Sequence, residues 1–356
     1  MTAAVEPSAK DEARELLVDL VSIPSPTGEE AEAAERLAAF FEAHNREVWI
    51  DEVGNVRAPA DDSVLLTSHI DTVPGDIPVR VEDGDDGKVL WGRGSVDATG
   101  ALAGMAVTAV ETGVSFLGVV GEEVDSRGSR FAIDDRDAVP EAVINGEPSG
   151  WDGVTLGYRG LLAGTYVAAS ESGHSSRPDN NAIQDAIAWW SNIESEFEAD
   201  EWEPVFERVT PKPTKMDGGL TEDGLSVEAT MDVQLRIPPE LSVEEVREIA
   251  DGYLVGMGSV HWKDKVEPVM ESPRTEIARA FRVAIRDAGG DPRLLRKTGT
   301  SDMNVFADHW DCQIVSYGPG DSDLDHAPNE HLPLAEYDRS IDVLESVTER
   351  LTGENE

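Results

Sequence analysis

Apolar residues in the first 150 positions alternate between helical and strand-like spacing. Four of them between positions 16 and 21 recur on one helix face, and the helix that they predict ends before Pro24 and Pro26. Short, continuous apolar runs predict buried strands instead. The pattern predicts helices at 11–21, 27–41, 98–112 and 126–133 and strands at 48–53, 64–68, 114–120 and 142–144. This alternation is typical of an α/β fold in which helices flank a mixed, mostly parallel sheet.

A second pattern begins after Trp151. Its order is β-α-β-β-α-β, that of a split βαβ sandwich, with strands predicted at 161–170, 205–216, 225–237 and 259–263 and helices at 180–197 and 241–254. The α/β pattern resumes near Pro273, so a smaller α+β domain is inserted into the larger one. We expect one domain of residues 1–157 and 271–356 and an inserted domain of residues 158–270.

The second predicted helix carries a start signal. Thr27 and Glu30 have the spacing of a capping box, in which both side chains accept backbone N–H groups at the helix start. We therefore expect Thr27 to be its N-cap.

Residues with metal-binding chemistry follow several predicted strands. His69 follows the strand at 64–68, and Asp71 is placed to accept the second ring N–H of that imidazole. Strand ends of this kind hold the sites of open α/β sheets. Imidazole and carboxylate ligands with a position left for water are typical of zinc sites that activate water. The inventory for such a centre is His69, Asp97, Glu123, Glu147 and His326.

Six motifs give the chain a resemblance to the M20-type zinc amidohydrolases, in that family's order. They are IPSPTGEE at 23–30, SHIDTVP at 68–74, GRGSVD at 92–97, GEE at 121–123, GHSS at 173–176 and DH at 325–326. The resemblance implies a zinc-peptidase-like catalytic domain. For the inserted domain it implies a lid that also forms a homodimer.

The resemblance also implies a role for each candidate ligand. Two Zn²⁺ ions per subunit share Asp97; Glu123 and His326 complete the site of one ion, and His69 and Glu147 that of the other. Cobalt and manganese stay open as the native metal.

Three further residues are implied to be catalytic. Glu122 is the general base and acid, and Asp71 orients His69. His174 donates a hydrogen bond to the developing oxyanion, and in the family this histidine reaches the partner's metal site.

Within the family, the runs at 146–160 and 297–304 resemble hydrolases that release lysine or ornithine from the terminal glutamate of an amino-group carrier protein. Arg236, a charged residue on an apolar strand, is expected either to bind a substrate carboxylate or to form a surface salt bridge. The turn at 297–302 predicts a substrate-lining segment with Thr300 and Asp302. Acetylornithine deacetylation, succinyl-diaminopimelate desuccinylation and dipeptide cleavage stay open, as does a metal-free relative that binds a carrier without turnover.

The charge balance restricts the partners. The 356 residues contain 72 Asp and Glu against 29 Lys and Arg, which gives a net charge of -43. Nucleic acid and anionic membranes are therefore excluded, whereas a carrier protein and small substrates are not. Because 40% of the residues are still apolar, the composition predicts a normal core under an acidic surface, as in proteins that work in molar salt.

A single cysteine, Cys312, excludes an internal disulfide and favours the cytoplasm. We interpret it as structural rather than nucleophilic. No apolar stretch has the length of a signal peptide core or a membrane span.

Overall fold

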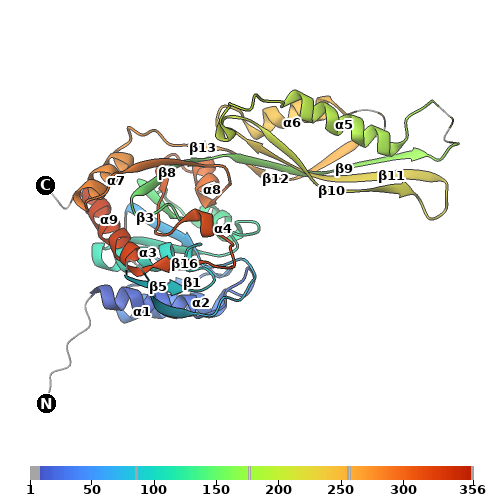
Figure 1. The fold of residues 1–356 in the computed structure, drawn as a ribbon. Coiled ribbons are helices and arrows are strands. Elements are labelled where there is room, and N and C mark those ends of the chain that lie inside the picture. The colour runs from blue at the N-terminus through green and yellow to red at the C-terminus, as the bar shows by residue number, and fades with distance from the viewer. Residues whose placement is uncertain are drawn as a thin grey trace, which may run out of the picture. The chain divides into compact units, whose positions relative to one another are not determined.

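The computed structural model describes residues 9–84, 87–174, 176, 178–254, 256 and 258–353 (Figure 1). The chain forms two compact units. The first is Met1–Leu156, Glu271–Leu295 and Val305–Glu356, and the second is Gly157–Met270 with Arg296–Asn304. The predicted inserted domain, 158–270, leaves out the segment 296–304, because nothing in the local pattern of that segment indicates the unit with which it packs.

A nine-stranded mixed sheet runs through the first unit. Its order is β1-β2-β6-β3-β7-β15-β8-β13, and β14 pairs with β8. The neighbours β6, β3, β7 and β15 run parallel, whereas the pairs β1/β2, β2/β6, β15/β8 and β8/β13 are antiparallel. The predicted mixed sheet is confirmed, but its parallel part is confined to the four central strands. The bounds are β1 Trp49–Ile50, β2 Val56–Ala58, β3 Asp61–His69, β6 Val114–Val119, β7 Ala142–Gly146, β8 Gly153–Tyr158, β13 Val269–Met270, β14 Arg293–Lys297 and β15 Gln313–Ser316.

Several helices of this unit pack against one another. Helices α1, α3, α9 and α7 contact one another in this order, and α3 also contacts β3 and β6. The bounds are α1 Ala9–Val21, α2 Ala31–Ala43, α3 Thr99–Thr112, α4 Arg127–Asp135, α7 Glu276–Asp287, α8 Asp302–His309 and α9 Leu334–Thr352.

Two parts of the predicted strand pattern are wrong. The strand expected at 48–53 is only Trp49–Ile50, because the Asp51 carboxylate accepts the N–H groups of residues 53–55 and turns the chain. A small antiparallel sheet, β16-β5-β4, was not predicted. It consists of β4 Arg80–Gly84, β5 Gly87–Trp91 and β16 His331–Pro333.

The predicted N-cap of the second helix is also wrong. Helix α2 begins at Ala31, Glu30 occupies the N-cap position, and no side chain caps the helix. The Thr27 hydroxyl instead donates to Oδ2 of Asp71 at 2.7 Å. A buried carboxylate distant in sequence therefore competes successfully for the hydroxyl that the local pattern assigned to the helix.

The second unit contains the predicted β-α-β-β-α-β order. Its antiparallel sheet has the order β10-β11-β9-β12, and α5 and α6 cover one face of it (Figure 1). Every second residue of β11 from Ala229 to Ile237 is buried toward these helices. The segment predicted as a strand from 205 begins with a short 3₁₀ turn, Val205–Glu207. The bounds are β9 Gly160–Glu171, α5 Ala182–Glu196, β10 Thr210–Leu220, β11 Ser226–Ile237, α6 Val243–Gly252 and β12 Ser259–Val266.

Candidate functional site

The parallel strands bring three of the predicted site segments to one sheet edge. In the ladder, Ser68 of β3 lies opposite Gly146 of β7, and His69 lies opposite Val119 of β6. His69 ends β3, Glu147 follows β7, and the Glu122–Glu123 pair follows β6 after one turn. Parallel pairing therefore places these side chains at the carboxyl ends of adjacent strands.

Two loops complete the group. Asp97 lies between β5 and α3, and His326 lies after the 3₁₀ turn η2 (Ser322–Leu324) with a φ of 59°. Nε2 of His326 is 3.1 Å from both Asp97 Oδ2 and Glu123 Oε2. Nε2 of His69 is 3.2 Å from Asp97 Oδ1. The Asp97 carboxylate thus lies between the two imidazoles.

Three side chains offer ligand atoms within 4.8 Å of one another, namely His69, Asp97 and Glu123. His326 joins them through the contacts given above. Glu147 is buried at the same sheet edge and accepts a 3.5 Å hydrogen bond from the Asn145 amide, but it lies outside the 4.8 Å group.

The Asp71 carboxylate does not accept the second ring N–H of His69, so that prediction is wrong in detail. Nδ1 of His69 donates to the backbone carbonyl of Asp71 at 2.8 Å, while the carboxylate is 3.7 Å away. This bond still leaves Nε2 facing Asp97. The fully buried Asp71 carboxylate accepts the N–H groups of Glu122 at 3.0 Å and Glu123 at 3.2 Å. It therefore fixes the turn that carries the paired glutamates.

Thr27 contacts the candidate site in a way that the sequence analysis did not predict. Its hydroxyl donates to the same Asp71 oxygen that receives the Glu123 N–H. The only sequence signal that linked Thr27 to the site was its place in the motif at 23–30. The spacing of Thr27 and Glu30, however, suggested a helix cap.

The charged groups of the candidate site shift one another's pKa values. Burial would lower the pKa of His69, yet the Asp97 hydrogen bond and the charge of Glu122 raise it well above its usual value. Burial would raise the pKa of Asp97, but hydrogen bonds from both imidazoles lower it. The pKa of Glu123 is raised, chiefly by burial. The Asp97 hydrogen bond raises the pKa of His326 to about 9.

The donor set fits a metal ion. Oε1 of Glu123 is buried and has no hydrogen-bond partner among the described residues. A buried carboxylate oxygen without a donor is costly unless a cation satisfies it. The imidazole and carboxylate groups here are the usual ligands of zinc and related ions.

The other predicted residues belong to the second unit. His174 is exposed after β9, and its Nδ1 accepts a 2.8 Å hydrogen bond from the Ser176 hydroxyl. Ser175, in the same motif, lies outside the described residues. Asp302 is buried at the start of α8.

Arg236 lies half-buried on β11 and donates to the Thr300 hydroxyl at 3.4 Å. No carboxylate within the described ranges forms an ion pair with Arg236. The lack of such an ion pair favours the expected role of Arg236 in binding a substrate carboxylate over the expected surface salt bridge. Burial and, to a lesser extent, the neighbouring charges of Arg236 and Arg208 lower the pKa of Arg159 to about 10.

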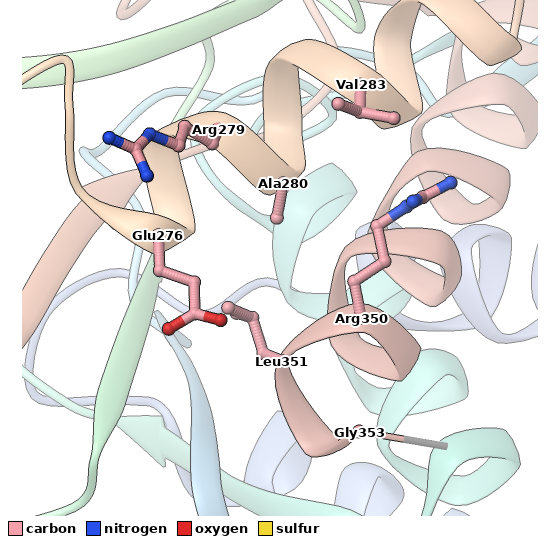
Figure 2. A pocket seen from close by; sticks show the side chains of 7 residues that line it. All are labelled: Glu276, Arg279, Ala280, Val283, Arg350, Leu351 and Gly353. Carbon is pink, nitrogen blue, oxygen red and sulfur yellow. The ribbon is translucent and has the colours of Figure 1, made fainter. Parts of the chain in front are cut away.

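Two of the cavities in the first unit lie apart from the candidate ligands. One, of about 560 Å³, lies between α7 and the end of α9, with Glu276, Arg279 and Arg350 in its wall (Figure 2). The other, of about 320 Å³, is lined mostly by apolar residues of 20–26 and 72–79. None of the predicted ligands lines either cavity. Burial raises the pKa of the Cys312 thiol to about 11, which disfavours the reactive thiolate and agrees with the structural interpretation of this residue.

No helix in the described ranges is long and apolar enough to cross a membrane.

Comparison with known proteins identifies similar chains. Residues 65–350 match the model of "Peptidase family M20/M25/M40". The LysW-lysine hydrolase of Deinococcus radiodurans is 40% identical over 96% of this chain and 97% of its own length. A putative LysW-lysine/LysW-ornithine hydrolase of Thermococcus kodakarensis is 38% identical over 98% of this chain and 94% of its own.

Solved structures share the fold. The M20 family metallo-carboxypeptidase Sso-CP2 of Sulfolobus solfataricus aligns with a TM-score of 0.75 and 18% identity, over 96% of this chain and 99% of that one. The YXEP protein of Bacillus subtilis, described as a dinuclear metal binding peptidase, aligns with a TM-score of 0.67 and 14% identity, over 97% and 99%. At these identities the likeness concerns the fold alone.

Proposed function

The chain belongs to peptidase family M20/M25/M40, and on this premise we propose that it is a metal-dependent amide hydrolase that releases lysine or ornithine from the C-terminal glutamate of an amino-group carrier protein. The names of the relatives at 40% and 38% identity support the substrate. The observation that carries the chemistry is the convergence of His69, Asp97 and Glu123 at one sheet edge.

The proposal includes two divalent metal ions per subunit, with zinc as the expected metal and cobalt or manganese as alternatives. Asp97 would bind both, Glu123 and His326 would complete one site, and His69 and Glu147 the other. When bound, such ions polarise the amide carbonyl and lower the pKa of water. The donor set and the unpartnered Glu123 oxygen support this assignment.

Proton transfer is assigned to Glu122. Hydrolysis adds water to the amide carbon and breaks the C–N bond, so one proton must leave the water and one must reach the departing amine. A single carboxyl group can perform both steps. The Asp71 carboxylate holds the backbone N–H of Glu122 at 3.0 Å and therefore fixes the position from which this side chain acts.

Substrate recognition is assigned to both positively and negatively charged residues. The Arg236 guanidinium beside Thr300 suits a substrate carboxylate, and Asp302 and Thr300 are proposed to line the substrate. Asp321, Asp323 and Asp325 precede His326 and suit the cationic side chain of lysine or ornithine. His174 is proposed to stabilise the oxyanion.

We also propose a metabolic pathway and a cellular environment for this activity. Release of lysine and ornithine would serve lysine and arginine biosynthesis, and the single cysteine favours the cytoplasm. The net charge of -43 favours a cell interior of high salt.

The decisive experiment compares substrates on one preparation in molar salt. The carrier carrying lysine, the carrier carrying ornithine, acetylornithine, succinyl-diaminopimelate and a dipeptide are each incubated with the protein, and the released amine and bound metal are measured. We expect the carrier conjugates to be cleaved fastest, by a protein with about two metal equivalents. Faster cleavage of a free acylated amino acid or dipeptide would reject the carrier assignment. A protein that binds the carrier, holds no metal and releases no amine would reject the enzyme.

A further inference from the structure

A buried carboxylate that has no assigned role lies directly behind the candidate ligands. Glu330 is fully buried, four residues after His326. Its Oε1 accepts the backbone N–H groups of Val96 at 2.9 Å and Asp97 at 3.1 Å. Its Oε2 accepts the N–H of Gly94 at 3.1 Å and Nη1 of Arg93 at 2.8 Å. All four partners are donors, so Glu330 acts only as an acceptor.

These bonds connect two ligand-bearing loops that are far apart in sequence. Three of the four donors are backbone N–H groups of residues 94–97, the turn that ends at Asp97. The fourth, Arg93, also donates to the carbonyl of Ala327 at 3.3 Å, the residue after His326. Glu330 and Arg93 thus connect the turn that ends at Asp97 to the segment that directly follows His326.

His326 needs such an anchor. Its side chain is 52% exposed, and its φ of 59° lies in the left-handed region that a residue with a Cβ rarely adopts. His326 lies outside the helices and strands, because η2 ends at Leu324 and β16 begins only at His331. Little packing therefore holds Nε2 of His326 within 3.1 Å of the Asp97 carboxylate.

We propose that Glu330, together with Arg93, is a positioning residue that sets the separation of Asp97 and His326 and so determines the affinity of the metal centre. This inference rests on the proposed function, since it requires that Asp97 and His326 bind metal. Glu330 touches neither substrate nor metal; it acts through the backbone of the ligand-bearing turn. Outer partners of metal ligands typically contribute about 10- to 100-fold in metal affinity.

The test is the substitution Glu330→Gln. Glutamine keeps the size of the side chain but replaces one accepting oxygen by an NH₂ group that faces N–H donors. We expect Zn²⁺ affinity, measured by competition with a chelating dye in molar KCl, to fall about 10- to 100-fold. The visible spectrum of the Co²⁺-loaded protein should also change, because the ligand separation changes.

Asp51→Asn is the matched control. Asp51 is likewise a buried carboxylate that accepts three backbone N–H groups, those of residues 53–55, and the Nε of an arginine, Arg57. Its turn carries no ligand. Asp51→Asn should lower the melting temperature, because it weakens the hydrogen bonds that a buried carboxylate accepts. It should leave Zn²⁺ affinity and the Co²⁺ spectrum as in the wild type.

If Glu330→Gln does not fold, Arg93→Lys replaces it, because lysine keeps the charge but cannot contact both Glu330 and Ala327 in the same way. Wild-type Zn²⁺ affinity in Glu330→Gln, or in Arg93→Lys where that variant is used, overturns the inference. An equal loss of affinity in Asp51→Asn also overturns it, since general destabilisation would then be the cause. If the wild-type protein itself binds no Zn²⁺, the proposed function is rejected. This result differs from the failure of the inference about Glu330, in which the wild type binds Zn²⁺ and the variant binds it equally well.

Discussion

Two adjacent glutamates carry different proposed roles at the site. Their backbone N–H groups share one acceptor, the Asp71 carboxylate, which fixes the turn. This anchoring does not involve the two side chains, so each side chain can have its own role. Oε2 of Glu123 lies 3.1 Å from Nε2 of His326, and its other oxygen has no donor among the residues described. This geometry supports the proposed metal-binding role of Glu123 and the proposed proton transfer by Glu122.

Glu122→Gln should therefore abolish turnover and leave metal binding nearly intact, because glutamine keeps the shape but cannot accept and return a proton as a carboxylate does. The loss should be about 10²- to 10⁴-fold and appear in kcat rather than KM. Glu123→Gln should instead lower the metal content, since a carboxylate ligand is removed. The measurement is zinc content and steady-state rate on the same samples.

The opposite pattern, in which Glu122→Gln loses metal and Glu123→Gln keeps it, would reverse the assignment within the pair. Full activity in both variants would place the chemistry elsewhere in the molecule.

At the scale of elements, the second unit is held together by the contact of α5 with the sheet and with α6. Trp189 of α5 is fully buried and stacks on Tyr166 of β9 at 4.9 Å between ring centroids. Its Nε1 donates to the carbonyl of Ala250 in α6 at 2.9 Å. One side chain thus connects three elements of the unit.

Trp189→Ala should destabilise the protein by about 3–5 kcal/mol, because it removes this hydrogen bond and leaves a cavity under α5. The measurement is denaturant unfolding in molar salt, followed by circular dichroism. The control is Trp202→Ala: Trp202 is 80% exposed, so its loss should change stability by no more than about 0.5 kcal/mol. Equal effects of the two substitutions would show that the core of this unit lies elsewhere.

At the scale of the whole molecule, the candidate catalytic residues are divided between the units. The proposed ligands and Glu122 belong to the first unit, and His174 belongs to the second. The family resemblance led us to expect that His174 acts in the partner subunit of a homodimer.

Mixing inactive His174→Ala with inactive Glu122→Gln should then restore part of the activity, since a mixed dimer contains one site with both residues intact. The measurement is the rate after the two variants are mixed and allowed to exchange subunits. Verified mixed dimers without any activity would reject action across the dimer.

The whole surface also predicts a salt requirement. With 72 acidic against 29 basic side chains, repulsion within the folded protein is strong in dilute buffer. The Debye length falls from about 10 Å at 0.1 M salt to about 3 Å at 1 M, so added salt should weaken that repulsion. We expect the melting temperature to rise steeply between 0.1 and 2 M KCl, and equally with NaCl. A melting temperature that does not depend on salt would contradict this.

The sequence by itself determined much of the fold and named the candidate ligands. Helical and strand spacing report which side of each element is buried, and this information is local. The β-α-β-β-α-β unit and the central strands could therefore be predicted. His69, Glu123 and Glu147 were recognisable because each follows an apolar run, and parallel strands bring such ends together.

Only the tertiary structure decided which polar groups hold the ligands in place. Thr27 was predicted to cap a helix but donates to Asp71, 44 positions away. The Asp71 carboxylate was predicted to orient His69 but fixes the turn at Glu122, 51 positions away. Glu330 showed no local signal, and its partner Gly94 is 236 positions away. A hydroxyl or carboxylate bonds any donor that folding brings within about 3 Å, and spacing along the chain does not contain that information.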